Sequence, residues 1–324
     1  MTTTAETKEL LSTVRVGEIP LEESPRRWLI EGLWGASSVG VIGGPPKLGK
    51  SWLGLDMAVS VATGTPCLDT FPVKESGPVL VYLAEDALPI LRERIAGLVR
   101  HRGLELFCVN LHVITEPTLR LDRTGDRMRL MATAMHIRPR LVLLDPLVRL
   151  HAANENDATE IAQLLSYFRE LQRRLDTSVI LVHHSRKNSS GGSQGQSLRG
   201  SSDIWAFGDS FLYLRRIKDQ ILLSMEHRAA AAPEPVFLRL VTTDEAAIHL
   251  AVTGTAGSEK AHRDRELRQA VLAAITESPD ITRGVLREKL GVKNERLGRV
   301  LDDLKSEGMV ERTAQGWRKT GQSV

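Results

Sequence analysis

The chain has 324 residues, of which 42% are hydrophobic and 26% charged, so it is long enough for one large folded domain plus a small one and is not a disordered protein. Its longest apolar runs, VLVYLA and LVLLD, are far shorter than the roughly 18 residues that cross a bilayer, and the N-terminus lacks a signal-peptide pattern. Two cysteines, Cys67 and Cys108, are too few for a disulfide framework or a four-cysteine zinc site. We therefore expect a cytoplasmic protein with no membrane segment.

The net charge of +3 is distributed unevenly along the chain. Residues 259–324 carry 14 basic and 11 acidic side chains, and the chain before them is neutral. Solvated helix faces often have such a surplus, so it only slightly favours a polyanionic partner.

Residues 1–21 are polar and without period, which predicts a flexible N-terminal segment. Short apolar runs rich in β-branched residues then alternate with helical patterns. Buried strands that alternate with helices predict an α/β domain with a mostly parallel sheet over residues 22–253. The expected strands are, in chain order, 37–44, 77–84, 139–146, 177–184 and 210–216.

Helical spacing is clearest after Asn154, where five apolar residues share one face. They are Ile161, Leu164, Leu165, Phe168 and Leu171. Three runs at 221–228, 235–241 and 247–252 suit antiparallel strands at one edge of the sheet. The small, polar stretch 254–262 is expected to be a linker.

The strongest motif is GGPPKLGKS, which contains G-x-x-x-x-G-K-[ST] between an expected strand and an expected helix. Glycines let backbone N–H groups curl toward a phosphate, and the helix N-terminus adds positive charge. The motif predicts that Lys50 contacts the β- and γ-phosphates of ATP and that Ser51 ligates Mg²⁺. Lys47 either contacts phosphate or is exposed to solvent. The residues expected to contact ATP are Gly44, Pro45, Pro46, Lys47, Leu48, Gly49, Lys50, Ser51 and Trp52.

Two other expected strands end in carboxylates, which a parallel sheet delivers to its ligand-binding edge. Asp145 ends LVLLD and is expected to hold Mg²⁺ through its water shell. Glu85 and Asp86 follow VLVYLA. Glu85 is expected to polarise the water that attacks the γ-phosphate, and Asp86 to cap the next helix, although both could be caps.

The strand VILVHH ends in His183 and His184. A histidine there can sense the γ-phosphate or be an ordinary structural residue. Shared metal binding ranks last, because successive side chains of a strand point to opposite faces. The loop that follows is basic at both ends, and Arg186, Lys187 and Arg199 are expected to contact DNA; an ordinary surface loop would have a similar composition.

The order of GGPPKLGKS, VLVYLAED, LVLLDPLVRLH, VILVHHSRK and SLRGSSDI resembles the RepA-type hexameric replicative helicases, within the wider RecA/DnaB-like ATPases. The resemblance covers roughly residues 22–250. It implies a ring, a hexamer of identical subunits, with ATP between neighbours and single-stranded DNA in the channel. It also implies the P-loop role for Lys50 and Ser51, a catalytic Glu85, a Walker B Asp145, and sensor roles for His183 and His184.

Such rings place an arginine finger from one subunit against the γ-phosphate held by the next. Members similar to DnaB carry Lys-x-Arg on a late strand, and this chain has Glu226-His227-Arg228 in the comparable place. Arg228 is the expected finger, and Glu226 departs from the pattern. Arg215 or Arg216 can share the role, and the ordinary alternative for Arg228 is a surface ion pair.

The C-terminal part, 263–324, resembles a winged helix-turn-helix domain. A helix over 263–277 buries Leu267, Val271, Ala274 and Ile275; Thr282 and Asn294 are expected to cap two further helices; and a hairpin turns at Gln315-Gly316. Such domains bind DNA or other proteins. The residues expected to contact DNA are Lys293, Arg296, Arg299, Arg312, Arg318 and Lys319.

Together these patterns predict an ATP-driven DNA motor that requires Mg²⁺ and forms a ring. A different class of protein with the same motifs is an ATP-switched regulator or replication initiator that binds DNA without unwinding it. A recombination ATPase that forms filaments is a third interpretation.

Overall fold

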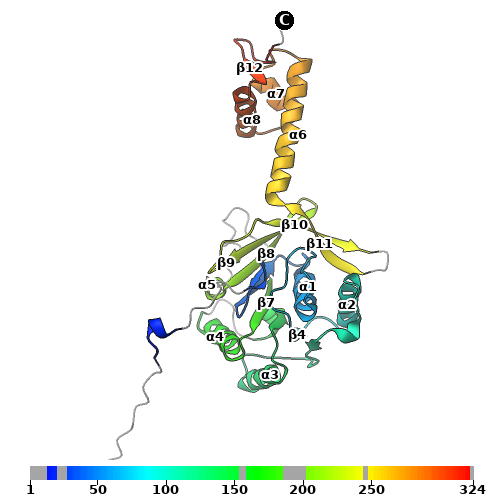
Figure 1. Cartoon of the computed structure of the whole chain (residues 1–324), viewed down its shortest axis with the longest axis vertical. Coiled ribbons are helices and arrows are strands. Elements are labelled where there is room, and N and C mark those ends of the chain that lie inside the picture. Colours follow the sequence, from blue (N-terminus) through cyan, green and yellow to red (C-terminus); the bar gives the residue numbers. More distant parts are fainter. Residues whose placement is uncertain (1–12, 20–27, 153–157, 185–201, 244–246, 322–324) are drawn as a thin grey trace, which may run out of the picture.

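The structure, a computed structural model, describes residues 13–19, 28–152, 158–184, 202–243 and 247–321. A nine-stranded sheet forms its centre (Figure 1). Its parallel strands are β3 (Val39–Gly44), β4 (Val79–Leu83), β5 (Leu111–Val113), β6 (Leu141–Asp145), β7 (Ser178–His184) and β8 (Ser210–Ile217). Its antiparallel strands are β9 (Gln220–His227), β10 (Val236–Thr242) and β11 (Ile248–Thr255). The order is β11-β10-β9-β8-β3-β7-β6-β4-β5.

Helices cover both faces of the sheet, because its strands are apolar on both sides. One apolar cluster joins the sheet to α1 (Lys50–Thr63) and α2 (Leu88–His101). Another joins it to α3 (Thr124–Ile137) and α4 (Ala158–Leu175), where Phe168 is fully buried. None of the helices in the described part of the chain is long and apolar enough to cross a membrane.

Smaller elements complete the described part of the chain. They are the 3-10 helices η1 (Val16–Glu18), η2 (Leu106–Cys108) and η3 (Leu147–Arg149), the short helix α5 (Ser202–Phe207), and the paired strands β1 (Trp28–Ile30) and β2 (Trp34–Gly35).

The eight strands expected from the sequence are all present, and the α/β fold with a mostly parallel sheet is confirmed. The sequence patterns missed β5, whose three residues are half-buried or exposed and carry no continuous apolar run. They also missed the β1–β2 pair, which is too short to give a period.

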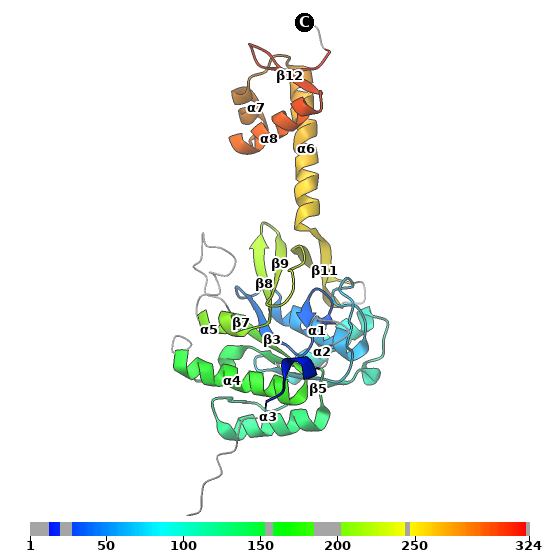
Figure 2. The ribbon, with the colours of Figure 1, turned by 60° about the vertical axis from the view of Figure 1, so that its left-hand side comes forward.

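The C-terminal lobe, residues 256–321, stands apart from the sheet at the far end of a long helix, α6 (Ala256–Glu277) (Figure 1 and Figure 2). It also contains α7 (Arg283–Leu290), α8 (Asn294–Ser306) and a hairpin of β12 (Val310–Arg312) and β13 (Trp317–Lys319). The predicted apolar face of the first helix is confirmed, since all four expected residues are buried in the cluster that joins these elements.

Two details of the C-terminal prediction are corrected. The expected linker 254–262 is mostly helical, because Thr255 and Ser258 form a capping box that starts α6 at Ala256. Asn294 does not cap α8. The cap position is Lys293, which makes no side-chain capping bond, whereas Thr282 caps α7 as expected.

The strand order places the glycine-rich loop at a topological switch point. The chain leaves β3 through α1 for β4, on one side of β3, whereas it leaves the adjacent strand β7 for β8, on the other side of β3. Connections that diverge in this way open a crevice beyond Gly44 at the carboxyl edge of the sheet. The ends of β4 and β6 reach the same edge. This arrangement brings the carboxylates that follow them toward the loop.

Close packing of β3 against β8 depends on Gly40. A Cβ atom on Gly40 would lie 1.8 Å from the backbone oxygen of Ser210. We expect Gly40→Ala to lower the free energy of unfolding by about 3 kcal/mol, because the backbone must shift to relieve the overlap. Urea unfolding followed by circular dichroism measures it. Gly125→Ala, in α3 with open space around it, is the matched control and should stabilise slightly.

Candidate functional site

The glycine-rich loop adopts a backbone that only some residues permit. Lys47 and Gly49 have positive φ angles of 62° and 81°. Gly44 also has a positive φ, and a Cβ atom there would lie 2.5 Å from the backbone oxygen of Leu214. The loop therefore curls tightly between β3 and α1, and the free N–H groups of the first turn of α1 face the crevice.

Lys50 lies at the start of α1 with its side chain folded back over the loop. Its Nζ donates hydrogen bonds to the backbone oxygens of Gly44 at 2.9 Å and Pro45 at 2.8 Å. The residue is only 3% exposed, and burial lowers its pKa to about 8, although Asp145 and Glu85 oppose this shift. The ammonium group thus has two carbonyl oxygens as partners. These are weaker acceptors than a phosphate, which would replace them.

Asp145 ends β6 beneath the loop and is 5% exposed. Burial raises its pKa to about 6, while a hydrogen bond from Ser51 and the charge of Lys50 oppose the shift. Its Oδ2 atom is buried without a hydrogen-bond partner. A carboxylate oxygen with no partner beside a serine hydroxyl fits a Mg²⁺ ion, which prefers oxygen ligands and keeps several waters.

The acidic pair after β4 has two different environments. Glu85 is half-exposed and pairs with Arg149, whose Nε lies 2.9 Å from Glu85 Oε1. Asp86 pairs with Arg94, at 2.5 Å. The expectation that Asp86 caps α2 is wrong, because Ala87 occupies the cap position without a side-chain bond and an arginine takes the Asp86 carboxylate instead.

His183 and His184 lie beside the start of the glycine-rich loop, since they pair in register with Gly43 and Gly44. The alternation of β7 puts His184 on the face of α1, with Ile180 and Val182, and His183 on the face of α4. His183 is buried and His184 half-buried. The expected DNA contacts Arg186, Lys187 and Arg199 lie outside the described residues.

Arg228 lies at the end of the sheet opposite to the glycine-rich loop. It follows His227, which pairs with Ser210 at the beginning of β8. Its Nη2 donates to the backbone oxygen of Ala206 at 2.6 Å, and its Nη1 lies 3.5 Å from Asp209 Oδ1. The side chain remains 55% exposed. Arg228 is therefore too distant in the fold to serve its own loop.

A cleft of about 440 Å³ opens in front of the loop, a size typical of small-molecule sites. Trp52 and Arg94 form part of its wall, with the guanidinium carbon of Arg94 5.3 Å from the Trp52 ring centre. Arg216 and Arg239 also line it, whereas the cleft does not include Arg215. No sequence motif connects Arg94 and Arg239 to the loop, so their place in the cleft could not be predicted from the sequence.

Three of the six basic residues expected to contact DNA in the C-terminal lobe form ion pairs. Arg296 pairs with Asp264 on α6 at 2.9 Å, Arg318 with Glu311 at 2.7 Å, and Arg299 with Glu295 at 3.4 Å. The other three expected DNA contacts are exposed. These are Lys293, Arg312 and Lys319.

The sheet order, the glycine-rich loop and the buried Lys50 and Asp145 define a P-loop nucleoside-triphosphate-binding protein with a RecA-like fold. The chain belongs to the AAA domain family, whose model matches residues 4–190.

Three solved structures are similar to this chain. The structure titled "ATPase Domain of G40P" is 17% identical, with a TM-score of 0.50, over 63% of this chain and 82% of that one. A DnaB-like replicative helicase solved with primase (16% identity, TM-score 0.48) covers 64% of this chain and 56% of its own. The RadB recombinase (16% identity, TM-score 0.48) covers 66% and 90%. The likeness to the G40P ATPase domain shows the fold of this chain.

The buried charge of Asp145 gives a prediction for stability. With a pKa raised from 3.8 to about 6, the native state binds this proton more tightly than the unfolded chain, so stability falls as pH rises through this window. We expect Asp145→Asn to raise the free energy of unfolding by about 2 kcal/mol at pH 7 without nucleotide. The gain should shrink as the pH is lowered from 6 toward 4. Urea titrations across this range measure both, and an equal effect at every pH contradicts the assignment.

Proposed function

We propose that this protein is an ATP-driven DNA motor, a ring-forming helicase of the RepA type that hydrolyses ATP to ADP and phosphate at subunit interfaces. The observation that carries the ATPase is the buried Lys50 ammonium within electrostatic reach of Asp145, whose buried Oδ2 has no hydrogen-bond partner, at the switch point. Membership of the AAA domain family supports it. The resemblance of the sequence motifs to RepA-type helicases supports the motor.

Nucleotide binding changes the partners of Lys50. Its Nζ leaves the carbonyls of Gly44 and Pro45 for the β- and γ-phosphates, which are stronger, charged acceptors. The N–H groups at the start of α1 complete the phosphate cradle. Ser51 and Asp145 would hold Mg²⁺, which supplies charge neutralisation when bound.

Hydrolysis needs a group that orients the attacking water, and Glu85 is the proposed one. The charge of Glu85 reaches Lys50, so the carboxylate lies close to the phosphate cradle. It is held by Arg149 at 2.9 Å in this state. Breaking this exposed ion pair has a small free-energy cost, so Glu85 can turn toward water once the γ-phosphate is in place.

The proposed ring rests on the position of Arg228 in the sheet. A finger at the end of the sheet opposite to its own loop acts only on a nucleotide held by another subunit. The exposed guanidinium already has weak surface partners, which a γ-phosphate would replace. We infer a homo-oligomer, most simply a hexamer, with DNA in its channel.

The P-loop residues give the first functional test. We expect Lys50→Ala to lose nearly all nucleotide binding and hydrolysis, because no other cation replaces the buried ammonium. Glu85→Gln should bind ATP normally and hydrolyse it about 100- to 10,000-fold more slowly. Equilibrium binding of a fluorescent ATP analogue and release of phosphate measure the two steps.

Asp86→Asn is the matched control for Glu85, since its carboxylate pairs with Arg94 and has no proposed catalytic role. Hydrolysis by Glu85→Gln at the parent rate would remove Glu85 from the mechanism. Normal turnover in Lys50→Ala would remove the site itself.

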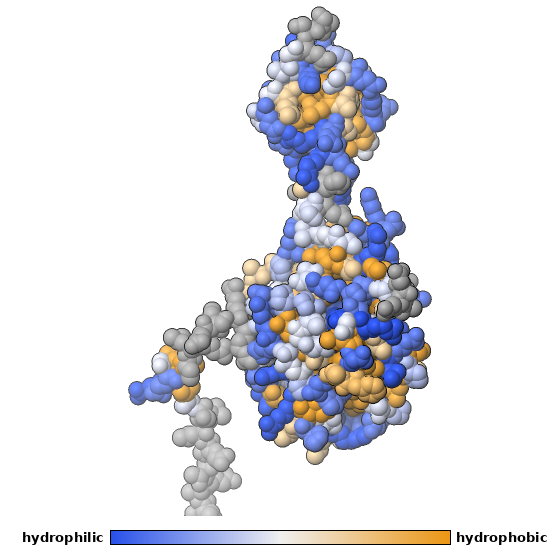
Figure 3. Space-filling model, turned by 45° about the vertical axis from the view of Figure 1, so that its right-hand side comes forward, coloured by the Kyte–Doolittle hydropathy of each residue, from blue (hydrophilic) through white to orange (hydrophobic). Residues whose placement is uncertain are grey.

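A second candidate is an ATP-switched DNA-binding regulator. The C-terminal lobe favours it, because three helices and a hairpin suit a winged helix-turn-helix and α6 holds this lobe well clear of the sheet (Figure 2). The 14 aromatic residues in the whole chain also favour it, since channels for single strands often stack bases on aromatic rings. The visible face of the lobe mixes hydrophilic and apolar residues, so protein partners are compatible with it as well (Figure 3).

A forked DNA substrate distinguishes the two candidates. The motor should release the displaced strand only with hydrolysable ATP and Mg²⁺, and Glu85→Gln should bind the fork without releasing it. The regulator should bind duplex DNA and release no strand with any nucleotide. Substituting both Lys293 and Lys319 by Ala should weaken duplex binding and reduce its salt dependence if the lobe contacts phosphate.

A further inference from the structure

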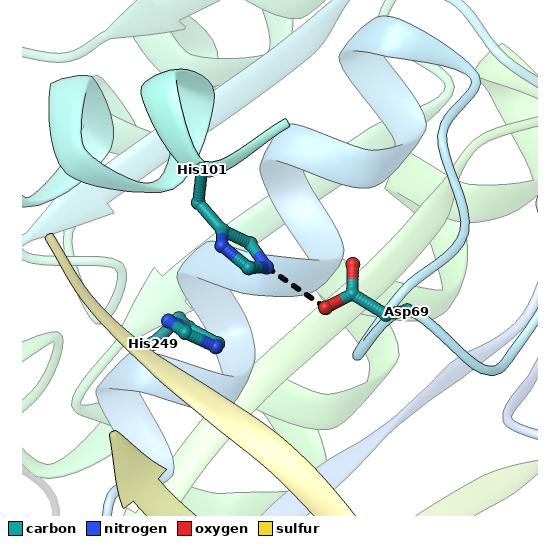
Figure 4. A group of neighbouring side chains, drawn as sticks. All are labelled: Asp69, His101 and His249. Atoms are coloured by element: carbon teal, nitrogen blue, oxygen red, sulfur yellow. Dashed lines mark hydrogen bonds and ion pairs between the residues drawn. The ribbon is translucent and has the colours of Figure 1, made fainter. Parts of the chain in front are cut away.

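Three side chains that carry metal-binding atoms meet on the α2 side of the sheet (Figure 4). Asp69 comes from the loop after α1, His101 from the last residue of α2, and His249 from β11. The Nε2 atom of His101 lies 2.8 Å from Asp69 Oδ2. One ligand atom from each residue lies within 4.8 Å of the other two.

The two imidazoles are stacked, with ring centres 3.8 Å apart and ring planes 19° from parallel. Two protonated rings at this distance would repel each other, so the stacking disfavours the doubly protonated pair. Burial and the neighbouring His101 lower the pKa of His249. A neutral imidazole is the form that binds a metal.

His249 also has an unused polar atom. It is 6% exposed, and its Nδ1 is buried without a hydrogen-bond partner. Buried ring nitrogens normally have a partner, and an unsatisfied one costs about 1 to 3 kcal/mol. Packing alone therefore does not explain a histidine on an edge strand at this position.

The surrounding charges leave room for a cation. The nearest ionised groups besides Asp69 are Asp56 and Arg102, which form a fully buried ion pair at 2.9 Å and neutralise each other. With both imidazoles neutral, as metal binding requires, the cluster would have a net charge of −1. Asp69 is half-exposed, so an ion has a route from solvent.

We propose that Asp69, His101 and His249 form a binding site for a transition-metal ion of the Zn²⁺ type. Two imidazole nitrogens and one carboxylate oxygen are a common ligand set for zinc, and water would complete the tetrahedron. Zinc bonds of about 2.0 to 2.1 Å place ligand atoms about 3.3 Å apart, so the most distant of the three atoms must close by up to about 1.5 Å and the rings must tilt toward each other. His101 and Asp69, at a helix end and in a loop, can make this adjustment.

The site is chemically separate from the P-loop. Ser51 and Asp145 offer only oxygen atoms, which suit Mg²⁺, whereas imidazole nitrogens select zinc and related ions. A bound ion would join β11 to α2 and to the loop after α1, two segments that the His101–Asp69 and Arg102–Thr65 hydrogen bonds already connect to each other.

The test uses the full chain without a histidine tag, stripped with a chelator, free of nucleotide, and titrated with Zn²⁺ alone against a chromophoric chelator. We expect one ion per chain and a higher melting temperature with Zn²⁺ than with the same concentration of Mg²⁺. His101→Ala and His249→Ala should each weaken binding by about 100-fold, and Asp69→Asn by about 10-fold. Asparagine tolerates the positive φ of 53° at position 69, so this variant should fold.

Three control variants identify the site. His112→Ala removes an exposed histidine elsewhere, and Cys108→Ser removes an exposed thiol; both should bind Zn²⁺ as the parent does. Lys50→Ala should also keep the ion, so this result is independent of the ATPase. The absence of saturable binding would overturn the proposal, and so would unchanged binding in both His101→Ala and Asp69→Asn, which are confirmed as folded by circular dichroism.

Discussion

Two opposite charges buried at one edge of the sheet determine what this molecule can do. Burial lowers the pKa of Lys50 to about 8 and raises that of Asp145 to about 6, so in the free protein burial disfavours the charged form of both side chains. Each charge partly stabilises the other, and a hydrogen bond from the Ser51 hydroxyl stabilises the carboxylate. A bound phosphate would give Lys50 an anionic partner, and Mg²⁺ would give Asp145 a cationic one. The free state is thus less stable than a neutral site would be, in exchange for a stronger response to nucleotide.

The fold of the sheet limits where the catalytic partners can come from. The carboxyl ends of β3, β4, β6 and β7 lie at the edge that holds the loop, whereas the antiparallel return of β9 takes Arg228 to the opposite edge. A complete set of charges around a γ-phosphate therefore requires cations from the cleft wall, such as Arg216, or a second subunit. This geometric requirement is the physical reason for proposing assembly.

Sequence alone predicted the buried strands, the loop and Asp145, because apolar runs and glycine spacing are local signals. It could not predict what depends on distant neighbours. Asp86 follows a strand as a cap would, but Arg94, nearly two turns into α2, pairs with it. Asn294 is a good capping residue that the chain did not use. Asp69, His101 and His249 are 32 or more residues apart in sequence, so only the folded chain shows that they meet.

The edge strand β11 connects these features. Leu250 lines the nucleotide cleft and its side chain lies beside Gly49 of the loop, while its neighbour His249 belongs to the proposed zinc site. Five residues after Leu250 the same strand ends at Thr255, which caps α6 and so sets the start of the C-terminal lobe. Neighbouring residues of one extended strand cannot move independently, because β10 fixes their register. An ion that immobilises His249 would therefore restrict the same strand that forms the cleft wall and leads to the lobe. Any signal that passes between nucleotide and lobe along the chain has to pass through it.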